Sequence, residues 1–116
     1  MSHQETRPWG SFTVLEDTAH YKVKRLDVNP GQRLSYQNHQ KRDEHWTVVM
    51  GVATVTLDGK ILKIPAGKDV FIPKTSKHRL ANEDQSSLVV IEVQTGEYFG
   101  EDDIQRFEDD YRRVDS

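Results

Sequence analysis

Residues 44–65 read EHWTVVMGVATVTLDGKILKIP, the clearest strand pattern in the chain. Two runs rich in Val, Thr, Leu and Ile are separated by Asp58-Gly59. This dipeptide favours a two-residue hairpin turn, which needs positive φ at both central residues. The stretch predicts three antiparallel strands, at Glu44–Met50, Val52–Leu57 and Lys60–Ile64.

Short strand-like runs continue on both sides of this hairpin, between turns that contain Pro or Gly. We expect further strands at Phe12–Leu15, Tyr21–Val28, Arg33–Gln37, Asp69–Ile72, His78–Ala81 and Leu88–Gln94. Many short strands with frequent turns are typical of a sandwich or barrel. The expected fold class is therefore all-β.

The length of 116 residues predicts one domain over residues 1–116, too short for a dinucleotide-binding domain plus a substrate domain. The absence of cysteine excludes disulfides, thiolate catalysis and cysteine zinc sites. A formal net charge of −3 argues against nucleic acid as a partner. No apolar run approaches the length of a membrane span, and no signal pattern opens the chain, so we expect a cytoplasmic protein without a membrane partner.

The last part of the chain differs from the rest. Residues 97–116 contain eight acidic residues and three Arg, whereas residues 1–96 contain 13 basic and 11 acidic residues. Ile104, Phe107 and Tyr111 lie at i, i+3 and i+7, the apolar stripe of a helix. We predict a barrel over 1–96 and a short acidic C-terminal helix within 97–116.

Two spaced motifs contain the residues with metal-ligand chemistry. They are Gly31-x5-Gln37-x-His39-x4-Glu44-x6-Gly51 and Gly67-x5-Pro73-x4-His78-x3-Asn82. Burying two imidazoles, an amide and a carboxylate inside a barrel without partners would cost several kcal/mol. A divalent ion would satisfy all four, so we predict a metal site at Gln37, His39, Glu44 and His78. Zinc, manganese, iron, cobalt and nickel all suit these donors.

The two motifs resemble those of the cupin superfamily, with Gln37 in place of its usual first His. The chain resembles type II phosphomannose isomerase more closely, from Arg7 to Arg113. The resemblance rests on the runs Arg7-Pro8-Trp9-Gly10, Glu44-His45-Trp46, His78-Arg79-Leu80, Ile91-Glu92-Val93-Gln94 and Gly100-Glu101-Asp102-Asp103-Ile104. The chain departs from the family pattern at Gln40 and Lys41, where the family commonly has His, and at Thr75 and Arg112.

This resemblance implies a single cupin barrel, a double-stranded β-helix or jelly roll. It also implies a homodimer, and a separate guanylyltransferase as a partner, because the family's cupin is usually the C-terminal part of a bifunctional enzyme. The implied reaction interconverts mannose 6-phosphate and fructose 6-phosphate through a metal-stabilised enediolate. Zinc is the first expectation for the ion.

A general base and phosphate-binding cations complete the implied site. Glu92 is the candidate base, because it points into the barrel if Val93 packs outward, and His45 is the second candidate. Arginine suits phosphate because its fork binds two oxygens at once. The cation candidates are Arg42 and Arg79, which are close in sequence to expected ligands, followed by Lys41, Arg7, Arg25 and Arg106.

Three other functions fit the same residues. The chain could bind a sugar or sugar phosphate without turning it over, or act as an iron-dependent oxygenase. It could also be a metal-free structural partner of a guanylyltransferase.

Overall fold

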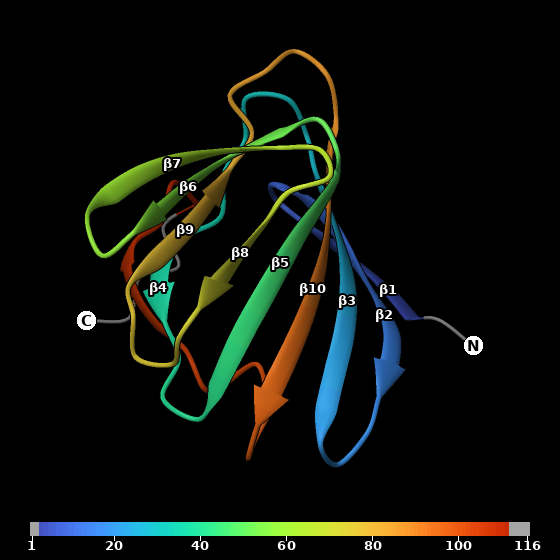
Figure 1. Cartoon of the computed structure of the whole chain (residues 1–116), viewed down its shortest axis with the longest axis vertical. Helices are drawn as coiled ribbons and strands as arrows, with labels where there is room; N and C mark the ends of the chain where they lie inside the picture. Colours follow the sequence, from blue (N-terminus) through green and yellow to red (C-terminus); the bar gives the residue numbers. More distant parts are fainter. Residues whose placement is uncertain (1–2, 112–116) are drawn as a thin grey trace.

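The computed structural model describes residues 3–111, which form eleven strands and no helix (Figure 1). The strands are β1 (His3–Arg7), β2 (Gly10–Asp17), β3 (Tyr21–Val28), β4 (Tyr36–Asn38), β5 (Arg42–Met50), β6 (Val52–Leu57), β7 (Lys60–Pro65), β8 (Asp69–Ile72), β9 (His78–Ala81), β10 (Leu88–Gly96) and β11 (Gln105–Glu108). Within these residues, no helix has the length and hydrophobicity needed to cross a membrane.

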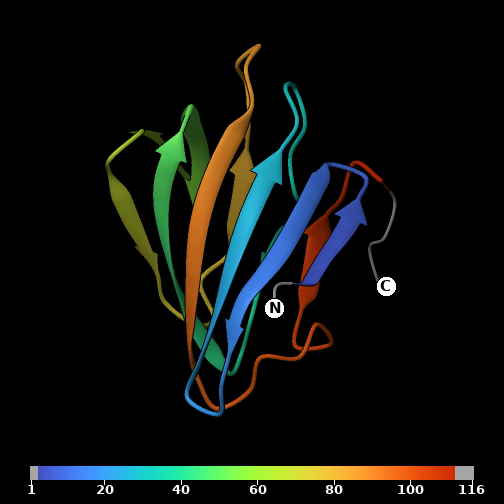
Figure 2. The same ribbon diagram turned by 90° about the vertical axis from the view of Figure 1, so that its right-hand side faces the viewer.

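The strands form two antiparallel sheets that face each other (Figures 1 and 2). One sheet has the order β1-β2-β3-β10-β5-β8, and the other has the order β11-β4-β9-β6-β7. The predicted hairpin is confirmed: Leu57 pairs with Lys60, and Asp58 and Gly59 have φ values of 46° and 84°. Because these positive values suit Asp-Gly, this local sequence favours the β6–β7 turn.

The core lies between the two sheets, because alternate side chains of each strand point inward. The buried apolar cluster consists of Trp9, Phe12, Leu26, Val28, Trp46, Val48, Ala53, Val55, Ile72, Leu80, Leu88 and Val90. Several inward positions of the same strands are occupied instead by charged or polar residues, among them Lys24, Glu44, Glu92 and Gln94. Because these polar side chains point inward, the barrel contains a polar site beside its apolar core.

The predicted C-terminal helix is wrong for the residues that the structure describes. Gln105–Glu108 is the edge strand β11, in which Arg106 pairs with Gln37 and Glu108 with Tyr36. An isolated short helix is marginal in water, whereas the free edge of β4 offers backbone partners. The register shifts between Arg106 and Glu108, and Phe107 packs against Tyr36 with ring centroids 6.1 Å apart. Residues 112–116 of the predicted helix lie outside the described range.

Two further differences concern strands. The strand predicted at Arg33–Gln37 is shorter, because β4 begins at Tyr36 and Arg33 makes only an isolated bridge to Ala81. Strand β1 was not predicted at all. Its sequence, HQETR, has no apolar alternation, and it forms through backbone pairing with β2. Polar edge strands of this kind lack the sequence signal of a half-buried strand.

Candidate metal centre

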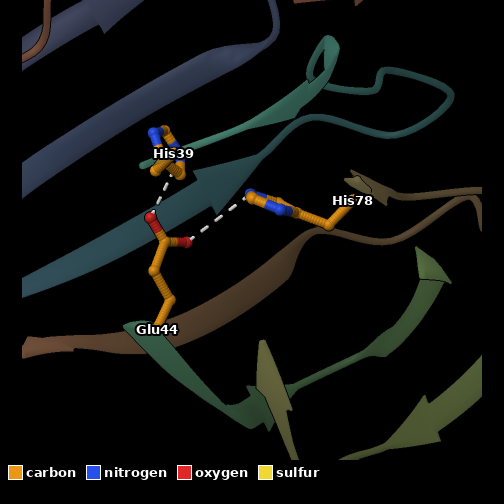
Figure 3. Close-up of side chains that lie close together, drawn as sticks. All are labelled: His39, Glu44 and His78. Carbon is orange, nitrogen blue, oxygen red and sulfur yellow. Dashed lines mark ion pairs between the residues drawn. The ribbon is translucent and has the colours of Figure 1, made fainter. Parts of the chain in front are cut away.

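Three predicted ligands converge inside the barrel (Figure 3). His39 follows β4, Glu44 is on β5 and His78 opens β9. One donor atom from each lies within 4.8 Å of the other two, and all three residues are buried. The side chains come from both sheets, so only the closed barrel brings them together.

The backbone hydrogen bonds of the two imidazoles engage Nδ1 of each ring and turn each Nε2 toward Glu44. His39 Nδ1 donates to the carbonyl oxygen of Asp103 at 2.6 Å, and His78 Nδ1 donates to that of Ser76 at 3.0 Å. Each Nε2 therefore faces Glu44, and that of His39 also accepts from Arg42. In metal sites, a ligating histidine usually donates a hydrogen bond from its other ring nitrogen to a carbonyl or carboxylate oxygen.

The separation of the donor atoms also fits a cation. His39 Nε2 and Glu44 Oε2 are 3.2 Å apart, and His78 Nε2 is 3.8 Å from Glu44 Oε1. Because the His39 ring is neutral, its Nε2 and Glu44 Oε2 are both hydrogen-bond acceptors. Two buried acceptors at this distance repel each other unless a positive charge lies beside them. The three residues thus suit a divalent ion.

Arg42 supplies part of this positive charge from within the protein. Its Nε donates to Glu44 Oε2 at 2.9 Å, and its Nη2 lies 3.3 Å from His39 Nε2. Burial of the Arg42 guanidinium works against its charge, but the nearby carboxylates raise its pKa above the ordinary value. Arg42 therefore stays charged and orients two of the predicted ligands.

The protonation states of His39 and Glu44 also favour metal binding. Burial, reinforced by Arg42 and His78, lowers the pKa of His39 to about 4, so this ring is neutral at pH 7. Burial alone would raise the pKa of Glu44, but His78 and Arg42 hold it below its ordinary value. A neutral imidazole and an ionised carboxylate are the forms that bind metals.

Gln37, the fourth predicted ligand, is beside the centre. It pairs with His78 across the sheet and lines the same cavity. Its carboxamide nitrogen donates to Ser35 Oγ at 3.1 Å. The structure thus brings Gln37 to the site while the His39, Glu44 and His78 donors form the compact group.

The candidate base Glu92 lies next to this group, on the inward face of β10. Its Oε2 accepts from Trp46 Nε1 at 3.1 Å, and the same indole donates to Glu44 Oε1 at 3.0 Å. Gln94 Nε2 donates to Glu92 Oε1 at 2.7 Å. Burial and the nearby Glu44 carboxylate raise the pKa of Glu92 to about 7. A carboxyl with this pKa suits proton transfer at neutral pH.

The structure does not bring the second candidate base, His45, to the site. Because it follows Glu44 on β5, its side chain points to the opposite face of the sheet. It is half-exposed there and bonds to Asp69, with Nε2 2.5 Å from Oδ2.

The His39–Glu44–His78 group, called the metal group below, lines a cavity of about 70 Å³ together with four cationic side chains. The cations are Arg7, Lys24, Arg42 and Arg106, and the apolar walls include Trp9, Phe12, Leu26 and Leu80. Of the cations predicted to bind phosphate, Arg7, Arg42 and Arg106 therefore reach the cavity. The structure places the other predicted cations elsewhere: Arg79 donates to Leu34 and Glu108, Lys41 lies over the Tyr98 ring, and Arg25 pairs with Asp27.

Two cavity residues, Lys24 and Glu101, were missed by the sequence analysis. Lys24 has the same strand parity as Leu26 and Val28, whose side chains are in the core. A charged residue at a core position of an amphipathic strand was the available signal. Glu101 gave no such signal, because it belongs to an irregular connection between the sheets.

Comparisons with known proteins place the chain in a family. A family model described as the mannose-6-phosphate isomerase C-terminal domain matches residues 1–109. The chain belongs to this family. A solved protein with a double-stranded β-helix domain from Klebsiella pneumoniae superposes with a TM-score of 0.72 at 21% identity, over 82% of this chain and 76% of that one. This similarity confirms the predicted cupin fold, except for the C-terminal helix.

Curated members of the family are considerably longer. Alginate biosynthesis protein AlgA of Pseudomonas aeruginosa is 49% identical over 108 residues, which are 93% of this chain and 22% of AlgA. Mannose-1-phosphate guanylyltransferase ManC of Salmonella typhimurium is 43% identical over 113 residues, 97% of this chain and 24% of ManC. The chain thus spans about a quarter of the length of these relatives. Family membership supports a sugar-phosphate isomerase-like cupin.

Asp103 connects the metal group to the segment that closes the barrel. Its carboxylate accepts from the backbone amides of Gln40 and Lys41, at 3.1 and 3.0 Å, while its carbonyl holds His39. We expect Asp103→Ala to weaken zinc affinity by about tenfold, because the lost carboxylate anchors Gln40 and Lys41 and so fixes the main-chain carbonyl that orients His39. Competition with a chromophoric chelator measures the affinity.

The neighbouring Asp102→Ala is the control, because its carboxylate contacts the Tyr98 hydroxyl instead. Equal zinc affinity in the Asp102 and Asp103 variants would contradict the positioning role.

Proposed function

We propose that this chain is a metal-dependent aldose–ketose isomerase that interconverts mannose 6-phosphate and fructose 6-phosphate. The observation that carries the proposal is the placement of Glu92, a buried carboxylate with a raised pKa, directly beside a His39–Glu44–His78 group suited to a divalent ion. The membership in the mannose-6-phosphate isomerase C-terminal family supports the choice of substrate.

In this proposal, His39, Glu44 and His78 hold the ion, and Arg42 keeps Glu44 ionised and in place. The bound ion would supply a Lewis acid for the oxygens on C1 and C2 of the sugar. Lewis-acid help is needed because the proton on C2 of an aldose is only weakly acidic.

Glu92 acts as the proton carrier. Its carboxylate takes the proton from C2 of the aldose, and the electron pair of that bond forms a bond between C2 and C1 while the carbonyl electrons move to O1. The proton then returns from Glu92 to C1 with the electron pair of the C1–C2 double bond, while O2 forms the carbonyl at C2 and its proton moves to O1. Trp46 and Gln94 hold one oxygen each of the Glu92 carboxylate, so it has a defined orientation.

A proton NMR time course tests this function. Fructose 6-phosphate is incubated in D₂O with the protein, reconstituted with one divalent metal at a time. We expect mannose 6-phosphate to form, and deuterium to enter the carbon that receives the proton. An EDTA-treated sample and the Glu44→Ala variant should show no product, because both lack the ion.

Glu97→Ala, which removes an exposed carboxylate, is the matched control and should retain turnover. Formation of a different aldose would overturn the substrate and leave the reaction class standing. No product with any metal would overturn the isomerase function, and a ligand-binding cupin without turnover would take its place.

A further inference from the structure

Lys24 occupies a position where the fold would ordinarily place an apolar residue. Its side chain is only 5% exposed, and its Nζ lies 4.3 Å from the centroid of the Phe12 ring. On β10, Glu92 is its direct cross-strand partner, and Trp46 is opposite Glu92 on β5. Lys24 is therefore one strand away from the proposed base, on the same inward face. Lys24 also lines the same cavity as Glu92.

The charge of Lys24 is met by a carboxylate that comes from outside the barrel. Glu101 Oε2 accepts from Lys24 Nζ at 2.7 Å, although the Glu101 side chain is 55% exposed. Glu101 belongs to the connection between β10 and β11, which passes from one sheet to the other at the lower end of Figure 1. Desolvation of the Glu101 carboxylate where it meets the cavity would raise its pKa, but Lys24 and Arg42 hold that pKa below the ordinary value. An ionised carboxylate thus sits against the cations of the cavity.

Two other cavity cations have donors with no acceptor. Arg42 Nη1 and Arg106 Nε are buried, and each lacks a hydrogen-bond partner within residues 3–111. Both residues line the same cavity as Lys24. An unpaired buried donor is costly, so such donors commonly bind a group that the protein itself does not supply. An anion with several oxygens would satisfy them.

We propose that Lys24 and Arg106 bind the phosphate of the sugar substrate, and that Glu101 is a built-in counter-anion which the phosphate displaces. The phosphate is the one group of a sugar phosphate that needs several cationic donors. The part of this inference that names a sugar phosphate rests on the proposed function. Arg42 contributes less to phosphate binding, because two of its nitrogens contact Glu44 and His39.

Titration with inorganic phosphate tests the site without turnover, followed by backbone amide shifts in ¹H–¹⁵N NMR spectra. We expect Lys24→Gln to raise the Kd for phosphate about tenfold or more, since a charge-assisted hydrogen bond is lost. Lys24→Arg should bind phosphate within about threefold of the wild type, because the guanidinium keeps the charge and also donates to phosphate oxygens. Glu101→Gln should bind phosphate several-fold more tightly, because its competitor is neutralised.

Two variants serve as matched controls. Arg25→Gln removes an exposed cation from the outer face of the same strand, and Glu97→Gln removes an exposed carboxylate from the same connection. Both should bind phosphate like the wild type. If Lys24→Gln does not fold, the exposed Glu101 variant still decides the question.

Three results would overturn the proposal: unchanged phosphate binding by Lys24→Gln, equal weakening by Arg25→Gln, or weaker binding by Glu101→Gln. The outcome is separable from that of the isomerase assay. Turnover with an unchanged KM in Lys24→Gln would refute the phosphate site alone. Phosphate binding that depends on Lys24, in a protein without turnover, would support this site and refute the isomerase.

Discussion

Glu92→Gln is expected to lower the turnover of fructose 6-phosphate by about 100-fold or more, the usual contribution of a general base. The amide has nearly the same volume as the carboxyl and still offers an oxygen to Trp46 or Gln94, but it cannot accept a proton from carbon. Metal content should be unchanged, because the metal group is made by His39, Glu44 and His78. The rate comes from product formation and deuterium incorporation in the NMR time course, and the metal content from elemental analysis.

The control for this variant is Glu97→Gln, whose carboxylate is exposed just beyond β10. It should retain turnover within about twofold. Wild-type turnover in the Glu92 variant would show that another group moves the proton. If the Glu92 variant lost both its metal and its turnover, Glu92 would act by supporting the metal ligands.

The second large effect concerns stability. We expect Leu88→Ala to lower the free energy of unfolding by about 2–5 kcal/mol and the Tm by roughly 8–20 °C. Leu88 is fully buried at the start of β10, where it pairs with Val28 in the core. Truncation removes buried methyl groups and leaves a cavity that the two sheets cannot close. Thermal unfolding followed by circular dichroism measures the change.

Leu15→Ala removes the same atoms from a side chain that is 47% exposed. Its effect should stay within about 0.5 kcal/mol, as for most surface substitutions. Equal destabilisation by the two variants would contradict the placement of the core between the sheets.

Strand alternation accounts for much of what the sequence predicted correctly. Residues 52–57 and 60–64 show both the pattern and the turn, and the structure has β6 and β7 there. The same period of two places Glu44 and Trp46 on one face of β5. It also places His45 on the opposite face, so the expectation of His45 as a second candidate base conflicts with the strand geometry. For the same reason Arg79, which follows His78 on β9, points away from the face that carries His78.

Features that depend on contacts between the sheets were not predictable in this way. The acidic residues 101–103 read as the start of a helix, whereas Glu101 pairs with Lys24 and Asp103 binds the turn before β5. Lys24 and Glu101 are 77 residues apart. No local propensity reports which distant charge a side chain will meet, because that depends on how the strands are ordered in the sheets.

By itself, the sequence predicted a β-strand fold and grouped His39, Glu44 and His78 as metal ligands, because strand alternation and motif spacing are local properties. Only the tertiary structure decided that residues 105–108 form an edge strand, and which cations face the cavity. The physical reason is that edge pairing and buried ion pairs are stabilised by groups from distant parts of the chain, and those groups become neighbours only when the two sheets close.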